Sequence, residues 1–301
     1  MGARASGAFP SHGALSLSRG AEQPSAGPAG ADAHGSRRRF CAWIGLAALT
    51  VAGGGGLLWW RRREGLEGAA REFHRLGGRP GPGFHGAGVP ASRKEYPNAK
   101  RVSLAPPGPC GDLTTGDTIN RRRSHRAFGE RPLTQQELSN LLHYAGGITA
   151  PEMGGEGLRA GPSAGALYPI EMYPVVRQVE GLEPGIYHYR FHDHALDLVI
   201  PGDLNARLGE ACAGQHWLAR APIAVVLAAV LGRTEAKYGE RGYRYVLLDC
   251  GHISENLYLA ATAMGLGACA VGAFEDERVN ALLGLDGEQE SALLVLPVGS
   301  V

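Results

Sequence analysis

The sequence contains little cysteine, and what it has is widely spaced. There are five cysteines among 301 residues, and no two form a C-x-x-C pair. Zinc sites and disulfide frameworks depend on closely or regularly spaced cysteines, so neither is indicated here. Cys212, Cys250 and Cys269 are instead predicted to be small buried side chains.

An excess of charge of either sign is also missing. Lys and Arg together number 30, Asp and Glu number 29, and the formal net charge is +1. Such a balance creates no field that would attract nucleic acid. The C-terminal two-thirds also has no stripe of basic residues with interleaved aromatic ones. We therefore expect no nucleic-acid partner.

Bulky apolar residues are scarce in the first 39 residues. This part consists almost wholly of Gly, Ala, Ser, Pro and Arg. Burial of so little apolar surface cannot offset the entropy lost on ordering. Residues 1–40 are therefore predicted to be disordered.

An apolar run follows, and residues 41–60 are predicted to be a hydrophobic membrane segment. Ala42–Trp60 carries no charge, and its length is close to that of a membrane-spanning helix. The preceding Arg37–Arg39 resembles the twin-arginine start of an export signal for folded proteins. No A-x-A cleavage site follows and Arg61–Arg63 comes next, so we expect a retained anchor with the domain outside or in the periplasm. Because the flanking arginines balance, the cytoplasmic face is the alternative.

Glycine and proline are abundant in the next fifty residues. Pro80-Gly81-Pro82-Gly83 and Pro106-Pro107-Gly108-Pro109 are the clearest examples. Such stretches are typical of linkers, so residues 61–111 are predicted to be a flexible tether. The folded domain is then predicted to span residues 112–301.

Hydrophobic periodicity predicts both helices and strands in this domain. Thr134 and Glu137 form a capping-box pattern before an apolar face that ends at Gly146. A longer helix is predicted for Tyr243–Met264, and its apolar residues exceed one packing face, which suggests that a second subunit covers part of it. These additional residues are Leu247, Leu248, Leu259 and Ala261. The predicted strands are Ile170–Arg177, Gly185–Phe191, Pro222–Leu231, Gly267–Phe274 and Ala292–Val298.

Three further patterns have simpler explanations than the chemistry they first suggest. Gly265–Ala270 fits the dinucleotide pattern G-x-G-x-x-A, but it follows a helix and precedes a strand, the reverse of the required order. His192–His194 is expected to be a hairpin turn, and no metal site is predicted. Asp249, His252 and Asn256 are expected to form hydrogen bonds within the protein.

Three segments together suggest a binding site. Arg121–Phe128 offers guanidinium groups and a hydroxyl suited to a phosphate monoester, although alone it could be a basic surface run. Gly161–Pro169 is a loop of small residues whose backbone can approach a flat ring closely. Ala270–Phe274 is a second such stretch, whose N–H groups could face N5 and O4 of a flavin. None of them needs a charged catalytic side chain, as expected where a cofactor supplies the redox chemistry.

In these motifs the sequence resembles the FMN-dependent nitroreductases, and within them the SagB-type azoline dehydrogenases. The resemblance covers residues 118–299 and rests on R-R-S-x-R-x-F, P-S-A-G-A-L-Y-P-I-E and K-Y-G-x-R-G-Y. It implies an α+β nitroreductase-like fold, in which helices flank an antiparallel-rich central sheet. It also implies FMN as the cofactor and an intertwined homodimer with two active sites at the subunit interface.

The resemblance further implies roles for individual residues. The residues implied to bind FMN are Arg122, Ser124 and Arg126 at its phosphate and ribityl chain, Pro162, Ser163, Ala164 and Gly165 on one side of the isoalloxazine, and Val271 and Gly272 at its N5 and O4 edge. Family members usually continue past P-V-G to a basic residue, whereas Val301 stands here. Weaker FMN binding is therefore expected.

Lys237 and Tyr238 match the pair that azoline dehydrogenases need for catalysis. Oxidation of a thiazoline or oxazoline removes a carbon-bound proton and a hydride, so a base must stand opposite flavin N5. Lys237 could be that base if burial and a neighbouring Arg233 or Arg241 lowered its pKa, and Tyr238 could hydrogen-bond the ring heteroatom. From residue type alone, both could equally lie on an exposed helix start.

We therefore expect an FMN-dependent oxidoreductase of the nitroreductase type that dehydrogenates an azoline or related small heterocycle. Its substrate would be a small molecule or a modified peptide. NAD(P)H-dependent reduction of nitro compounds or quinones is the alternative. A membrane-tethered flavin-binding protein without turnover is a second alternative.

Overall fold

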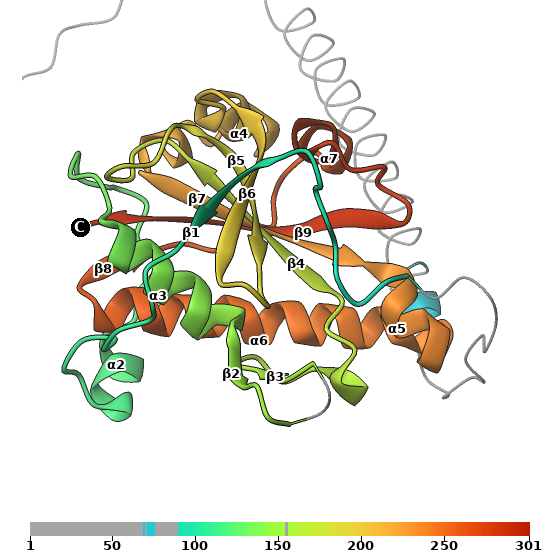
Figure 1. Cartoon of the computed structure of the whole chain (residues 1–301). Coiled ribbons are helices and arrows are strands. Elements are labelled where there is room, and N and C mark those ends of the chain that lie inside the picture. The colour runs from blue at the N-terminus through green and yellow to red at the C-terminus, as the bar shows by residue number, and fades with distance from the viewer. Residues whose placement is uncertain (1–68, 70, 76–89, 154–155) are drawn as a thin grey trace, which may run out of the picture. The chain divides into compact units, whose positions relative to one another are not determined.

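The computed structural model of this chain describes residues 69, 71–75, 90–153 and 156–301, all within the unit Glu67–Val301 (Figure 1). The disorder predicted for residues 1–40 and the membrane segment predicted for residues 41–60 lie outside these residues. Among the helices that are described, none has both the length and the apolar character needed to cross a bilayer.

A seven-stranded sheet forms the centre of this unit, and all its paired strands run antiparallel. In order across the sheet the strands are β1 (Lys100–Ser103), β6 (Ala195–Pro201), β5 (Gly185–Arg190), β4 (Ile170–Val176), β7 (Ile223–Val230), β9 (Glu290–Ser300) and β8 (Leu266–Ala268). A separate two-stranded sheet pairs β2 (Ile148–Ala150) with β3 (Leu158–Arg159). The predicted α+β fold with an antiparallel-rich sheet is confirmed.

Helices cover both faces of the large sheet (Figure 1). The helices are α3 (Gln135–Gly146) and α6 (Arg241–Ala263) on one face, and α4 (Asn205–Ala211) and α7 (Asp276–Leu283) on the other. Successive side chains of a strand point to opposite faces. Val225 and Leu227 of β7 therefore pack with α3 and α6, whereas Ala224 and Val226 pack with α4 and α7. A strand buried on both faces reads as a continuous apolar run, which is why β7 is so apolar.

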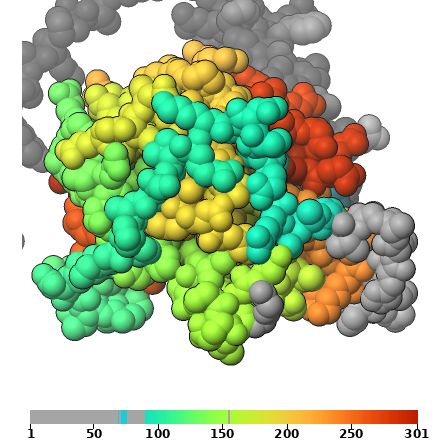
Figure 2. All heavy atoms as spheres, in the orientation of Figure 1, coloured from blue at the N-terminus to red at the C-terminus, as the bar shows by residue number. Residues whose placement is uncertain are grey.

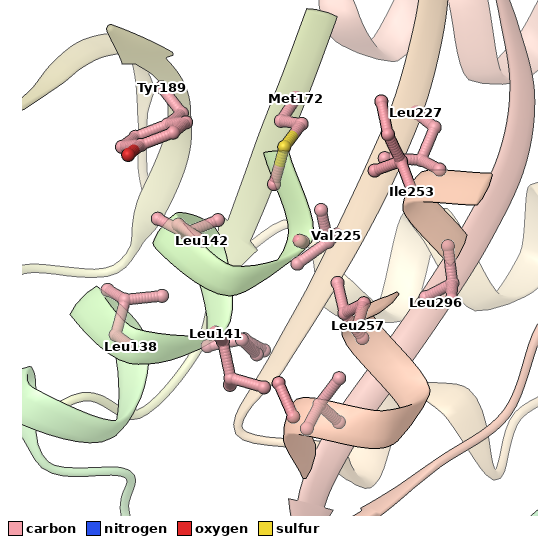
Figure 3. Close-up of a cluster of buried hydrophobic side chains, with 14 of the residues drawn as sticks. Leu138, Leu141, Leu142, Met172, Tyr189, Val225, Leu227, Ile253, Leu257 and Leu296 are labelled. Carbon is pink, nitrogen blue, oxygen red and sulfur yellow. The ribbon is translucent and has the colours of Figure 1, made fainter. Parts of the chain in front are cut away.

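The larger core lies between α3, α6 and the sheet (Figure 3). Its side chains include Leu138, Leu141 and Leu142 of α3, Ile253 and Leu257 of α6, and Met172, Val225, Leu227 and Leu296 of the sheet. Full burial of one such side chain contributes about 1.5–3 kcal/mol. This core therefore fixes α6 against the sheet and, with it, the positions of polar residues along the same helix.

The two predicted helices are confirmed. Thr134 Oγ1 accepts a hydrogen bond from Glu137 N at 3.1 Å, and the Glu137 carboxylate accepts one from Thr134 N at 2.8 Å, so the capping box starts α3. On α6, Leu247 and Leu248 remain 40% and 53% exposed, as expected for surplus apolar residues, whereas Ala261 is fully buried.

The segment at residues 90–103, which we call the N-terminal strap, corrects the predicted tether. Its residues 100–103 form β1 and pair with β6, and Arg101 Nε donates to Asp197 Oδ1 at 2.9 Å. In Figure 2 the teal atoms of this part of the chain lie across yellow atoms. The prediction that residues 61–111 form a flexible tether is therefore wrong for the strap, and the domain starts well before residue 112. Lys100–Ser103 has one apolar residue, too few to produce a strand signal.

The predicted strands and the predicted hairpin turn are confirmed, except for one strand that is shorter. Four of the five predicted strands match β4, β5, β7 and β9. The fifth, Gly267–Phe274, is shorter in the structure: β8 ends at Ala268, and Val271 forms only an isolated bridge to Val295. The turn predicted at His192–His194 is confirmed, because these residues join β5 to β6 as a hairpin.

Candidate functional site

The first group of candidate residues meets at the C-terminal half of α6. Arg122 follows helix α2 (Thr115–Arg121), and its guanidinium lies 5.2 Å from the ring centroid of Tyr258. The Ser124 hydroxyl is 3.1 Å from the Tyr258 hydroxyl, which also accepts a hydrogen bond from Ala270 N at 2.5 Å. Tyr258 thus ties the arginine-rich segment to the Ala270–Phe274 stretch. We call Arg122, Ser124, Tyr258 and Ala270 the Ser124 group.

The backbone strengthens this connection. Ser124 forms a parallel bridge with Ala268 of β8, and His125 N donates to Ala268 O at 2.9 Å. Ser124 and Arg126 are exposed, and Arg122 is half-buried. The group therefore presents guanidinium and hydroxyl groups at an accessible surface, as the binding of a phosphate requires.

The second group lies around the small-residue loop, Gly161–Pro169. Ser163 Oγ donates to Asp249 Oδ2 at 2.6 Å and accepts a hydrogen bond from Tyr168 N at 2.9 Å. Ala164 N lies 3.4 Å from Asp249 Oδ1. Burial raises the pKa of the Asp249 carboxyl, although its hydrogen bonds with Ser163 and Ala164 act in the opposite direction. The Ser163 side chain is therefore used to hold the loop onto α6.

The polar stripe on α6 plays the structural role predicted for it. Besides Asp249, His252 Nδ1 is 3.3 Å from Pro162 O, and Asn256 Nδ2 donates to Ala145 O at 3.3 Å. The prediction that these residues form internal hydrogen bonds is confirmed. Asp249 and His252 fix the start of the loop against the long helix, whereas Asn256 connects that helix to the end of α3.

Lys237 and Tyr238 approach the same loop from helix α5 (Leu231–Tyr238). Gly165 has a left-handed φ of 65°, and a Cβ atom placed there would lie 2.7 Å from Tyr238 Oη and 2.8 Å from Lys237 Nζ. Any residue other than glycine would displace these two polar atoms. We call Ser163, Gly165, Lys237, Tyr238 and Asp249 the Gly165 group.

The surroundings of Lys237 decide between the two alternatives within one chain. Its side chain is exposed, and the guanidinium of Arg233 is turned away into a buried pair with Glu171, with 2.6 Å between Nη1 and Oε1. The described part of one chain therefore does not bury Lys237 as its role as a base would require, and the position of Lys237 fits the exposed alternative. Tyr238 is half-buried, and its ring packs edge-on against Tyr245 at 4.9 Å between centroids. Arg241 Nε in turn donates to the Tyr245 hydroxyl at 2.8 Å.

The two groups are not brought together by one chain. Asp249 and Tyr258 are nine residues apart on α6, which corresponds to roughly 13.5 Å along the helix axis. Figure 1 shows the same separation, with α2 and β8 near one end of α6 and α5 near the other. A site that uses both groups at once therefore needs either an elongated ligand or a second subunit.

The predicted contacts of Val271 and Gly272 need one correction. Val271 N donates to Val295 O at 2.8 Å, and Val295 N donates to Val271 O at 3.0 Å. The N–H of Val271 is thus engaged within the chain and does not face outward. Gly272 is exposed, so it is the residue of this pair whose backbone lies at the surface.

The chemistry of these residues fits a flavin mononucleotide. The Ser124 group, with Arg126, supplies a hydroxyl and guanidinium groups for a phosphate. The Gly165 group supplies a loop of small residues on which the polar atoms of Lys237 and Tyr238 converge. In the part of the chain that the structure describes, no cluster of His, Cys, Asp or Glu is arranged to hold a metal ion.

Comparison with known proteins gives a consistent result. Residues 119–300 match the Nitroreductase family. The chain is 40% identical over 188 residues to nitroreductase MJ1384 of Methanocaldococcus jannaschii. The aligned region covers 62% of this chain and 91% of that protein. It is 29% identical over 243 residues to the microcin B17-processing protein McbC of Escherichia coli, covering 72% and 88%. The structure of the E. coli microcin synthetase McbBCD complex with truncated pro-MccB17 bound is similar with a TM-score of 0.54 and 25% identity, covering 78% of this chain and 92% of that one.

Proposed function

Because this chain belongs to the nitroreductase family and is an oxidoreductase, we propose that it is an FMN-dependent dehydrogenase that oxidises an azoline ring. The similarity to McbC and to the McbBCD structure supports the SagB-type branch. The observation that carries the proposal is the convergence of Lys237 Nζ and Tyr238 Oη on Gly165. A base and a hydrogen-bond donor beside the loop are what azoline oxidation needs, whereas simple hydride transfer to a quinone needs neither.

Each residue has a separate role in this proposal. Bound FMN would accept the hydride that leaves the substrate carbon. Lys237, as the neutral amine, would take the carbon-bound proton at Nζ. The Tyr238 hydroxyl would donate a hydrogen bond to the ring heteroatom, and the Tyr245 ring would hold Tyr238 in place. Glycine at position 165 keeps both polar groups close to the loop surface.

We propose a homodimer in which each FMN contacts both subunits. Arg122, Ser124 and Arg126 of one subunit would hold the phosphate and ribityl chain, with Gly272 at the flavin edge. Pro162–Gly165, Lys237 and Tyr238 would come from the other subunit. The exposed Leu247 and Leu248 on α6 support this arrangement, because a second subunit would cover them. A second subunit would also bury Lys237, which a single chain leaves exposed.

The substrate class follows by analogy with the relatives. McbC is named for the processing of microcin B17, and the McbBCD structure contains truncated pro-MccB17. We propose a peptide or small molecule that carries a thiazoline or oxazoline ring. Attachment to a membrane through residues 41–60, with export by a twin-arginine route, remains a proposal that fractionation of cells expressing the full chain would test.

The decisive experiment is mass spectrometry of an azoline-bearing peptide incubated with FMN-loaded protein. We expect the loss of two hydrogen atoms per ring. Lys237→Ala should lower this rate by at least about a hundredfold, the usual contribution of a general base, while leaving FMN content and quinone reduction unchanged. Lys100→Ala is the matched control, because Lys100 is exposed and lies on the strap. Equal loss of both activities in Lys237→Ala would contradict the assignment.

The alternative is an NAD(P)H-dependent nitro or quinone reductase, and the exposure of Lys237 within one chain favours it. Anaerobic addition of NAD(P)H distinguishes the two. Bleaching of the flavin by NAD(P)H, without bleaching by the azoline peptide, would support the reductase. A flavin that neither compound bleaches would support a binding protein without turnover.

A further inference from the structure

A small cavity lies between the N-terminal strap and the hairpin formed by β5 and β6. Its volume is about 20 Å³. Its lining includes Arg159 of β3, Glu171 of β4, His188 of β5 and His192 of the hairpin turn. Four cations line it, and three of them are paired with carboxylates, namely Arg93, Lys94 and Arg190. The fourth is Arg159.

Three nitrogen atoms of this lining are buried and have no hydrogen-bond partner among the described residues. They are Arg159 Nη1, His188 Nδ1 and His192 Nε2. His188 is 1% exposed, so water outside the protein does not reach it. The carboxylate oxygen paired with His192 Nε2, Glu156 Oε2, lies 3.8 Å away, beyond hydrogen-bonding distance. Buried polar atoms without protein partners are uncommon, and three such atoms belong to residues that line this one cavity.

The charge of Arg159 leads to the same conclusion. Among the described residues, no carboxylate oxygen lies within 4.0 Å of its guanidinium nitrogens, the distance that defines an ion pair. Its guanidinium packs on the rings of Phe191 and Tyr168 at 3.7 and 4.7 Å from their centroids. Burial lowers the pKa of Arg159 to about 10, which still leaves it cationic.

The nearest buried carboxylate, Glu171, already serves other partners. It accepts from Arg233 Nη1 at 2.6 Å and lies 2.8 Å from His188 Nε2. The single negative charge of Glu171 therefore balances Arg233, and the positive charge of Arg159 is left uncompensated. Such a charge is costly to the fold unless an anion accompanies it.

We propose that this cavity binds one monatomic anion, chloride under ordinary conditions, against Arg159 Nη1, His192 Nε2 and His188 Nδ1. A water-sized occupant needs roughly 10–15 Å³, so a single-atom anion fits whereas phosphate or acetate does not. The bound anion would link the β5–β6 hairpin to Arg159, which stands two residues before the small-residue loop. This site is separate from the proposed flavin site and does not depend on it.

His188 contributes to the site through both ring nitrogens. When the ring is the imidazolium, Nε2 donates to the Glu171 carboxylate, 2.8 Å away, and Nδ1 donates to the anion.

Two measurements on the full-length chain test this site. In crystals soaked in sodium bromide, we expect an anomalous scattering peak inside the cavity. In thermal unfolding at constant ionic strength, the midpoint in sodium chloride should exceed the midpoint in sodium gluconate. The difference should be about 3–6 °C when the chloride concentration is about ten times the dissociation constant of chloride. The rise should saturate as the chloride concentration increases. Cavity density that shows only water, or equal midpoints in both salts, would overturn the proposal.

Variants separate a specific site from a general salt effect. Arg159→Met should abolish the difference between chloride and gluconate. Lys100→Met removes the same charge from an exposed side chain that pairs with Glu183 outside the cavity, and should retain that difference. If Arg159→Met does not fold, the bromide peak in the unaltered protein decides the question alone.

Discussion

At the scale of single residues, Asp249 has the clearest structural task, because it holds the small-residue loop through Ser163 and Ala164. Asp249→Ala should therefore weaken FMN binding, since it removes hydrogen bonds to a charged group worth about 1.5–3 kcal/mol, or roughly tenfold or more in dissociation constant. Asp249→Asn keeps an oxygen that can accept from Ser163 and should retain most of the affinity. Fluorescence titration of the apoprotein with FMN measures both. Equal affinity in the two variants would show that the loop does not need this contact.

The same residue gives a pH dependence whose sign is fixed by its pKa. Burial raises the pKa of Asp249 in the folded protein above its ordinary value of 3.8. The folded state then holds its proton more tightly than the unfolded state. Ionisation of Asp249 therefore destabilises the fold progressively as the pH rises from about 4 through the raised pKa. Asp249→Asn lacks this ionisation.

Urea unfolding between pH 4 and pH 7 measures the effect. The free energy of unfolding of the unaltered protein should fall relative to that of Asp249→Asn as the pH rises. A constant difference over this range would mean that Asp249 titrates normally.

At the scale of elements, the N-terminal strap is part of the scaffold of the Gly165 group. Lys94 pairs with Glu290 of β9, and Arg233 of α5 donates to Ala91 O at 2.8 Å. The same guanidinium donates to Tyr168 O, at the end of the small-residue loop, at 3.1 Å. Arg233 thus connects the strap, the loop and the helix that carries Lys237.

Removal of the strap should therefore destabilise the domain. A chain that starts at Gly111 loses β1 and leaves the partly buried Glu290 without its cation, and breaking one buried pair typically costs about 3–5 kcal/mol. We expect its urea midpoint and soluble yield to fall well below those of a chain that starts at Gly88. If both truncated chains unfold at the same midpoint, the strap contributes nothing to stability.

The sequence alone predicts those elements whose signals are local. The capping box of Thr134 and Glu137 and the apolar periodicity of α6 lie within single helices, so both helices could be located. The strap could not, because Arg101 and Lys94 are stabilised by Asp197 and Glu290, which are far away in the sequence. Tyr258 was missed for a related reason: its role depends on contacts with Ser124 and Ala270 that only the fold creates.

At the scale of the whole molecule, the separation of the Ser124 group from the Gly165 group determines how an active site can be assembled. If one site takes Arg126 from one subunit and Lys237 from the other, each subunit serves two sites at once. A C2 dimer has this property, because its interface repeats every contact by symmetry. Single-chain assembly and shared assembly then predict different behaviour for mixtures of two inactive variants.

We expect Arg126→Ala to be inactive through loss of FMN and Lys237→Ala to be inactive in azoline oxidation. After subunit exchange in an equal mixture, half of the dimers carry one subunit of each kind. In a shared arrangement, one site of each mixed dimer receives both altered residues and the other receives neither. The mixture should therefore recover about one quarter of the unaltered activity. If one chain supplies both residues, every site keeps one defect and no activity returns. Mixing either variant with itself is the control, and it should recover no activity.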